Sequence, residues 1–174
     1  MKRYQSLIFS IAVLFSINLF SQDAGLIPKV SDYLENNGTM LQYKDAYKAL
    51  LNLMEKQFPK SDRNNNGWLY LERNETKALS EIRDLLIPIY IKHFDKKDID
   101  EMHKFYTSDV GEQLVKDRTE LTTKQQSKVD SFFNSKVGVK IKDKQKVLSE
   151  EIAGVSEYWS KDLYQTAVLL LKEQ

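Results

Sequence analysis

IDEMHKFYTSDVG, from Ile99 to Gly111, organises the rest of the chain, because its pattern returns 27 residues later as VDSFFNSKVG, from Val129 to Gly138. In both copies an aromatic pair precedes a short polar residue, a serine, a charged residue and the dipeptide Val-Gly. A pattern that recurs in this way predicts a repeated structural unit. We therefore expect two copies of one motif, near residues 99–121 and 126–148.

Each copy carries the signals of a helix, a tight corner and a second helix. Ile99, Met102 and Tyr106 fall at positions i, i+3 and i+7, which places them on one face of a helix. The side-chain oxygen of Ser108 or Ser135 can then accept a hydrogen bond from a free backbone N–H of the next helix, as N-cap residues do. The motif is thus predicted to be helix, corner, helix.

Gly111 and Gly138 stand three residues after these serines, in the first turn of the second helix of each copy. A glycine there lets another helix or a stretch of backbone approach closely, because it has no side chain. An anion site is the alternative, since free N–H groups and the helix dipole attract negative charge. We interpret Ser108, Gly111, Ser135 and Gly138 as a structural motif for close packing.

The aromatic pairs suggest where a partner would bind. Adjacent residues lie about 100° apart around a helix, so both rings of a pair cannot point into the same core. We expect Phe105 and Phe132 to be buried in the bundle, and Tyr106 and Phe133 to lean towards the junction between the copies. A groove lined by all four rings is the hypothetical binding site.

The run LLIPIYIKHFDKKDIDEMHKFYTSDVGEQLVKD, from Leu85 to Asp117, resembles the DUF2059 family of small secreted or periplasmic helical bacterial proteins. The residues that carry the resemblance are Pro88, Tyr90, Phe94, Phe105, Tyr106, Ser108 and Gly111. Asp109 departs from the family pattern, which usually has proline there, a residue that suits the first position of a helix. The resemblance covers residues 44–120 and implies a helical envelope protein with no established activity.

Residues 1–21 have the composition of a secretory signal peptide, since Lys2 and Arg3 precede an apolar run from Leu7 to Phe20. A membrane-anchoring helix is the alternative, but that run is shorter than the roughly 20 residues needed to cross a bilayer. We expect residues 22–174 to be a single mature domain, periplasmic or secreted, without stable membrane insertion. The absence of cysteine excludes disulfides, thiol chemistry and lipid attachment through an N-terminal cysteine.

The charge balance argues against a nucleic-acid partner. Removal of residues 1–21 leaves 24 Lys and Arg against 25 Asp and Glu, whereas phosphate binding needs a dominant basic face. The one basic concentration consists of Lys136, Lys140, Lys142, Lys144 and Lys146. A solvated helix face is the interpretation that we favour for these lysines, and a patch for anionic lipid or another polyanion is the alternative.

Helical periodicity continues on both sides of the repeated motif and predicts an all-α fold, a compact helical bundle. The apolar stripes predict helices over residues 26–34, 39–58 and 79–94. Thr39 is expected to cap the second of these and Asp95 the helix that opens the first motif copy. The stripe from Val137 to Leu170 is unbroken by proline and predicts one long C-terminal helix.

The segment DRNNNGWLYLE, from Asp62 to Glu72, imitates a calcium-binding loop in its first six positions. The match then fails, because Arg73 stands where the bidentate carboxylate should be. An Asn-Gly turn accounts for the same residues without a metal. We favour a polar connecting loop anchored by Trp68, with calcium binding as the alternative.

No catalytic motif is visible in the sequence: it has no HExxH, no GxSxG, no Gly-rich phosphate loop and no cysteine nucleophile. The adjacent carboxylates Glu150 and Glu151 have nothing that marks them as an acid and a base. His93 and His103 are ten residues apart, so they do not share a helix face as a pair of metal ligands would. We expect no enzyme activity, no cofactor and no metal site.

Two hypotheses of different classes follow for the function. The first is a non-enzymatic envelope protein that binds a partner protein, or itself, through the groove between the motif copies. The alternative is a hydrolase or a lipid- or small-ligand-handling protein whose site assembles from residues scattered in the sequence. A pocket with converging acids or histidines of shifted pKa would favour the alternative.

Overall fold

The computed structural model describes residues 25–172, so the predicted signal peptide at residues 1–21 lies outside the described residues. All regular structure in residues 25–172 is helical and this range has no strand, which confirms the predicted all-α fold. Within the same range, no helix is long and apolar enough to cross a membrane.

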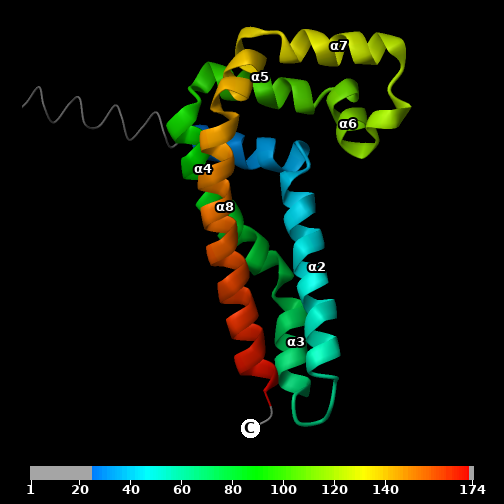
Figure 1. The fold of residues 1–174 in the computed structure, drawn as a ribbon, viewed down its shortest axis with the longest axis vertical. Coiled ribbons are helices and arrows are strands. Elements are labelled where there is room, and N and C mark those ends of the chain that lie inside the picture. The colour runs from blue at the N-terminus through cyan, green and yellow to red at the C-terminus, as the bar shows by residue number, and fades with distance from the viewer. Residues whose placement is uncertain (1–24, 173–174) are drawn as a thin grey trace, which may run out of the picture.

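The described chain is a succession of helices joined by short corners (Figure 1). It opens with a helical segment at residues 25–36. The helices that follow are α2 (Thr39–Gln57), α3 (Asn65–Arg73), α4 (Glu75–His93), α5 (Lys96–Tyr106), α6 (Asp109–Lys116), the 3-10 helix η1 (Arg118–Glu120), α7 (Thr123–Phe133) and α8 (Lys136–Leu171).

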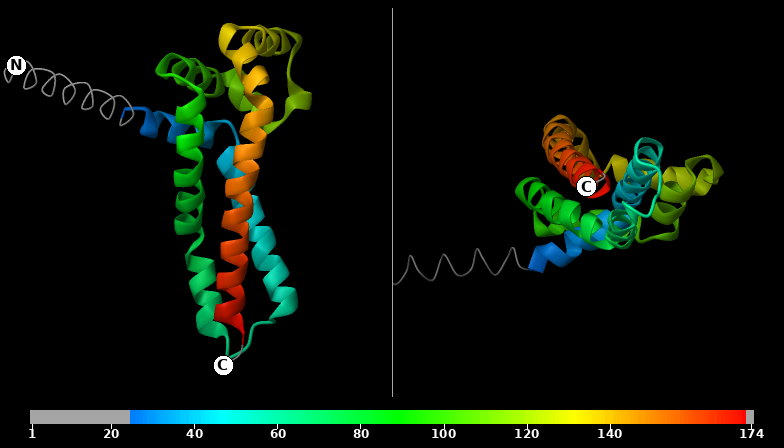
Figure 2. Two further views of the ribbon diagram at one scale, coloured as in Figure 1. Left: turned by 60° about the vertical axis from the view of Figure 1, so that its left-hand side comes forward. Right: turned by 90° about the horizontal axis from the view of Figure 1, so that it is seen from below.

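The 36-residue helix α8 runs along the length of the molecule, which confirms the predicted long C-terminal helix (Figures 1 and 2). α2 and α4 lie along α8, and α3 packs against its C-terminal end. α5, α6 and α7 gather around its N-terminal end. The bundle therefore carries the two serine-containing corners, which precede α6 and α8, together at one end.

The core consists of two buried clusters within the described residues. The larger one joins segment 25–36, α2, α4, α5 and α8, and it includes Tyr33, Tyr47, Leu86, Phe94 and Trp159. The smaller one lies where α3 meets the end of α8, and it includes Met54, Trp68 and Leu171. Burial of these side chains removes apolar surface from water along the whole length of α8.

The start of α2 differs from the prediction. α2 begins at Thr39, but its N-cap is Gly38, which has a φ of 83° in the left-handed region. The side-chain oxygen of Asn37 accepts a hydrogen bond from the Thr39 N–H at 2.9 Å. The predicted Thr39 cap is therefore wrong, because the sharp turn requires glycine one residue earlier.

The predicted loop at residues 62–72 is also wrong, since most of it forms helix α3. The Asn64 side chain accepts from the Ser61 N–H at 2.9 Å and donates to the Pro59 carbonyl at 3.0 Å, which closes the turn before α3. Gly67 lies inside α3, and a Cβ there would be 2.9 Å from the carbonyl carbon of Leu170. The glycine thus serves close packing of α3 on α8, whereas an Asn-Gly turn was expected.

Candidate functional site

The two corners have the same hydrogen-bond geometry. Ser108 is the N-cap of α6, and its oxygen accepts from the Gly111 N–H at 3.2 Å. Ser135 is the N-cap of α8, and its oxygen accepts from the Gly138 N–H at 3.3 Å. Each hydroxyl donates in turn to the carbonyl three residues earlier, at 2.6 Å. The hydroxyl groups thus tie each helix start to the helix before it.

Both glycines lie against the last turn of the preceding helix. A Cβ at Gly111 would overlap the Phe105 carbonyl oxygen and lie 2.6 Å from the Tyr106 Cα. A Cβ at Gly138 would overlap the Phe132 carbonyl oxygen and lie 2.6 Å from the Phe133 Cα. Both N–H groups are taken by the serine oxygens, so the geometry favours the packing interpretation over an anion site.

The positions of the aromatic rings agree with the prediction only in part. Phe105 and Phe132 are half-buried and stack on each other, with ring centroids 3.9 Å apart. Tyr106 packs edge to face against Tyr33 at 5.7 Å, at the margin of the core, and Phe133 is 41% exposed. Phe105 and Phe132 therefore meet directly between the two corners. The second rings also reach across, since Phe133 packs edge to face against Phe105 at 6.2 Å and Tyr106 against Phe132 at 6.1 Å.

A groove of about 530 Å³ opens beside this ring stack. We call it the corner groove, and its lining is Glu101, Lys104, Phe105, Ser108, Asp109, Val110, Lys128, Phe132, Ser135 and Val137. Three pairs of identical residues in this lining stand at the same 27-residue offset: the two phenylalanines, the two serines and the two valines. Tyr106 and Phe133 do not line it, so the groove holds only two of the four rings assigned to the predicted site.

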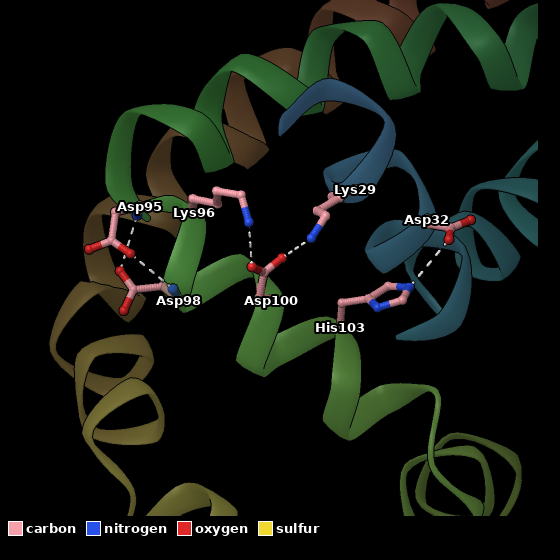
Figure 3. Close-up of polar contacts among 7 residues, drawn as sticks. All are labelled: Lys29, Asp32, Asp95, Lys96, Asp98, Asp100 and His103. Atoms are coloured by element: carbon pink, nitrogen blue, oxygen red, sulfur yellow. Dashed lines mark hydrogen bonds and ion pairs between the residues drawn. The ribbon is translucent and has the colours of Figure 1, made fainter. Parts of the chain in front are cut away.

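A set of charged contacts holds segment 25–36 against α5. Figure 3 shows Lys29 and Lys96 converging on the Asp100 carboxylate, with the Lys96 contact at 2.8 Å. His103 Nε2 lies 3.2 Å from the Asp32 carboxylate on the same segment. Hydrogen bonds from Lys29 and then Lys96 hold the pKa of the Asp100 carboxyl below its usual range.

The start of α5 is capped as predicted. The Asp95 carboxylate accepts from the Asp98 N–H at 3.0 Å and the Asp98 carboxylate accepts from the Asp95 N–H at 3.1 Å, so the two form a capping box (Figure 3). The Asp98 N–H bond is the main reason why the pKa of Asp95 is lowered. Asp98 is buried and also pairs with Lys140, which fastens α5 to α8.

Glu151 has a structural role that its sequence context does not predict. Its carboxylate accepts from Lys92 at 2.6 Å and lies 3.0 Å from His93 Nε2, whose side chain is 8% exposed. The Lys92 and His93 hydrogen bonds hold the pKa of Glu151 below its usual range. No periodic signal links residues 58 positions apart, so the sequence offered no sign of this contact. Its effect is to join α4 to α8.

The predicted basic concentration is divided between two environments. Lys140 pairs with Asp98, while Lys136, Lys142 and Lys146 are exposed.

His93 and His103 bind different carboxylates on different helices, as described above. In residues 25–172, no group of three or more His, Cys, Asp or Glu side chains is arranged to hold a metal ion.

Comparison with known proteins supports the resemblance in the motif region. The model of the family DUF2059, described as an uncharacterized protein conserved in bacteria, matches residues 80–131. The match runs from α4 through the whole first corner and ends inside α7. No curated protein and no solved structure matches the chain.

Proposed function

We propose that the protein is a non-enzymatic envelope protein that binds a partner protein through the corner groove. The observation that supports this proposal is the composition of the groove: the stacked rings of Phe105 and Phe132 lie beside charged residues of both signs. Protein interfaces commonly combine an apolar centre with a polar rim. The envelope location rests on the signal peptide predicted at residues 1–21.

Rigidity also supports a binding role for the groove. Both corners are held by serine caps and by glycines packed on backbone, so the lining is positioned before any partner arrives. A preformed surface loses little conformational entropy on binding. We therefore expect a partner whose apolar side chain rests beside the two rings.

The rim indicates the chemistry of that partner. It carries Glu101 and Asp109 together with Lys104 and Lys128. A surface of mixed charge fits a protein segment with side chains of both signs, while a nucleic acid would require a dominantly basic face. The acids of lowered pKa named above, Asp95, Asp100 and Glu151, are absent from the groove lining and serve contacts between helices.

We further infer that the two corners are copies of one unit, so that the groove forms where the copies meet. The repeated sequence pattern and the matching serine and glycine geometry support this inference. Duplication would explain why three pairs of identical residues in the lining share one sequence offset.

The test is capture of a partner from an envelope fraction with the parent protein and two groove variants, Glu101→Lys and Lys128→Glu. Both side chains are exposed, so the variants should keep the fold. Lys124→Glu is the matched control, because Lys124 is an exposed lysine of α7 outside the groove. We expect the groove variants to lose a captured protein that the control retains. Equal capture by all four proteins would refute the proposal.

A further inference from the structure

A second hollow, separate from the corner groove, lies along α8. We call it the α8 cleft: it has a volume of about 500 Å³ and is bounded by α8, by Tyr90 of α4 and by Phe133 at the end of α7. Its apolar walls are Phe133, Ile141, Leu148 and Ile152. Cavities of this size and character are typical of sites for small apolar ligands.

Tyr90 is the first sign that the α8 cleft is more than a packing defect. Its side chain belongs to the core and is only 8% exposed, yet its hydroxyl makes no hydrogen bond with any described residue. Tyr43 and Tyr47 differ in this respect, since their hydroxyls bond to Ser156 at 2.5 Å and to the Leu71 carbonyl at 2.7 Å. Among the described residues, the one buried side-chain polar atom without a partner is Arg83 Nε, so the Tyr90 hydroxyl is not sealed in the core. Tyr90 lines the α8 cleft, so a ligand there that accepts from its hydroxyl would gain a hydrogen bond.

The polar edge of the α8 cleft shows the same lack of partners. Lys142, Gln145 and Ser149 line it from one side of α8, and none of them makes an ion pair or hydrogen bond among residues 25–172. Lys142 is the one charged residue in the lining, which contains no acid. Lys140, two residues earlier, is engaged by Asp98. The cleft thus presents the Lys142 ammonium group without an ionic partner, and an anionic group on a ligand would complement it.

The dimensions of the α8 cleft suit a hydrocarbon chain. Its lining on α8 extends from Gly138 to Ile152, which at about 1.5 Å per residue is about 21 Å. One leaflet of a bilayer core is about 15 Å thick, and this is the length over which an acyl chain extends. A single chain can therefore lie along the cleft from Lys142 towards Ile152.

We propose that the α8 cleft binds a fatty acid, with its carboxylate at Lys142 and the Tyr90 hydroxyl and its chain along Ile141, Leu148 and Ile152. Burial raises the pKa of Tyr90 to about 12, so its hydroxyl stays protonated and can donate near neutral pH. Phe133, which is large and exposed, lies at the α7 end of the cleft and would cover the part of the fatty acid next to its carboxylate. This site is independent of the corner groove and of any protein partner.

The experiment is calorimetric titration of the purified protein with dodecanoate below its micelle concentration. Dodecyltrimethylammonium, which has the same chain and the opposite charge, is the control ligand. We expect dodecanoate to bind with one site and the cation to bind at least about tenfold more weakly, because one charged hydrogen bond is worth about that factor. Failure of dodecanoate to bind, or equal binding of the two amphiphiles, would overturn the proposal.

Three variants locate the site. Lys142→Glu should weaken dodecanoate binding at least about tenfold, and Tyr90→Phe about fivefold. Ser149→Trp should abolish binding, because the indole would fill the cleft. Lys146→Glu is the matched control, an exposed lysine of α8 outside the lining, and it should bind as the parent does.

A melting curve of each variant checks that it is folded. Lys142 and Ser149 are exposed, so their variants should fold and keep the test valid even if Tyr90→Phe unfolds. Unchanged binding in Lys142→Glu and Ser149→Trp would place the ligand elsewhere and overturn the assignment. Because no partner protein is present, this outcome is independent of the capture experiment on the corner groove.

Discussion

The rings of Phe105 and Phe132 stack face to face, with centroids 3.9 Å apart and planes within 3° of parallel. Each ring stands on the last turn of a helix, immediately before a serine-capped corner. The stack therefore joins the two corners directly, and it lies in the wall of the corner groove. Stability of the motif and the shape of the candidate site consequently depend on the same contact.

The first prediction measures this contact. In a double-mutant cycle, Phe105→Ala and Phe132→Ala should show a coupling free energy of about 1 kcal/mol, as stacked aromatic pairs do. The free energy of unfolding from denaturant titration gives the coupling. Phe105→Ala combined with Leu169→Ala, which is exposed at the other end of α8, should show none. Equal coupling in both cycles would contradict a direct interaction.

The second prediction concerns the two glycines of the corners. Gly111→Ala and Gly138→Ala should each lower the free energy of unfolding by about 1–3 kcal/mol, because the added Cβ meets backbone that cannot easily move. Gly154→Ala is the matched control, since its Cβ would meet nothing within 4 Å. That change should stabilise α8 by about 0.5–1 kcal/mol. Chemical denaturation distinguishes the expected loss of stability in the corner variants from the expected gain in the control. Unchanged stability in both corner variants would show that the packing role is wrong.

Loss of a serine cap should also be measurable. Ser108→Ala and Ser135→Ala should each cost about 1 kcal/mol, the usual effect of removing an N-cap hydroxyl. Ser127→Ala is a suitable control, because Ser127 is exposed and its hydroxyl makes no hydrogen bond within the described chain. Thermal melts of the three variants would give the comparison. If the control has a melting temperature as low as those of the cap variants, the proposed capping role of Ser108 and Ser135 is wrong.

Tyr106 and Phe133, the second residues of the two aromatic pairs, should contribute differently to the free energy of unfolding. Tyr106 is half-buried against Tyr33, so Tyr106→Ser should cost about 2 kcal/mol. Phe133 is 41% exposed, so Phe133→Ser should cost less than about 1 kcal/mol. Urea denaturation of the two variants tests this ranking. The reverse order would mean that Phe133 is the ring that completes the core.

Acid should weaken the attachment of segment 25–36. The pKa of Asp100 is depressed in the folded state by Lys29 and Lys96, so its contribution to stability is present above the unfolded pKa, about 3.9. This contribution is lost as the pH falls through the lower, folded pKa. The melting temperature of the parent should therefore fall in that range more than that of Asp100→Asn. Glu157→Gln, a change at an exposed carboxylate of α8, should melt as the parent does at every pH.

The sequence alone determined the helices of the motif and their ends. The periodicity of apolar residues predicted α5 and α8, and Asp95, Ser108 and Ser135 occupy the N-cap positions that their short polar side chains favour. These features depend on hydrogen bonds between residues three or four apart, so the local sequence contains the information needed to predict them. The same holds for the DUF2059 resemblance, which rests on residues that lie close together in the chain.

The segment at residues 62–72 is an example in which the local sequence did not determine the structure. Its Asn-Gly pair is a common turn signal, but Gly67 lies inside α3 because the helix gains contacts with Leu170 and Leu171 at the far end of the chain. Packing against α8 outweighed the local preference. The loop prediction was wrong for that reason.

The tertiary structure decided which rings stack between the two corners, which lysine of α8 pairs with the buried Asp98, and that the Tyr90 hydroxyl has no hydrogen-bond partner among the described residues. Phe105 meets Phe132, Lys140 meets Asp98, and the Tyr90 hydroxyl meets no described residue. Periodicity places a side chain on one face of its own helix, but its neighbours depend on the rotation and crossing of other helices. Those angles follow from packing the whole core at once, so no single stretch of sequence specifies them.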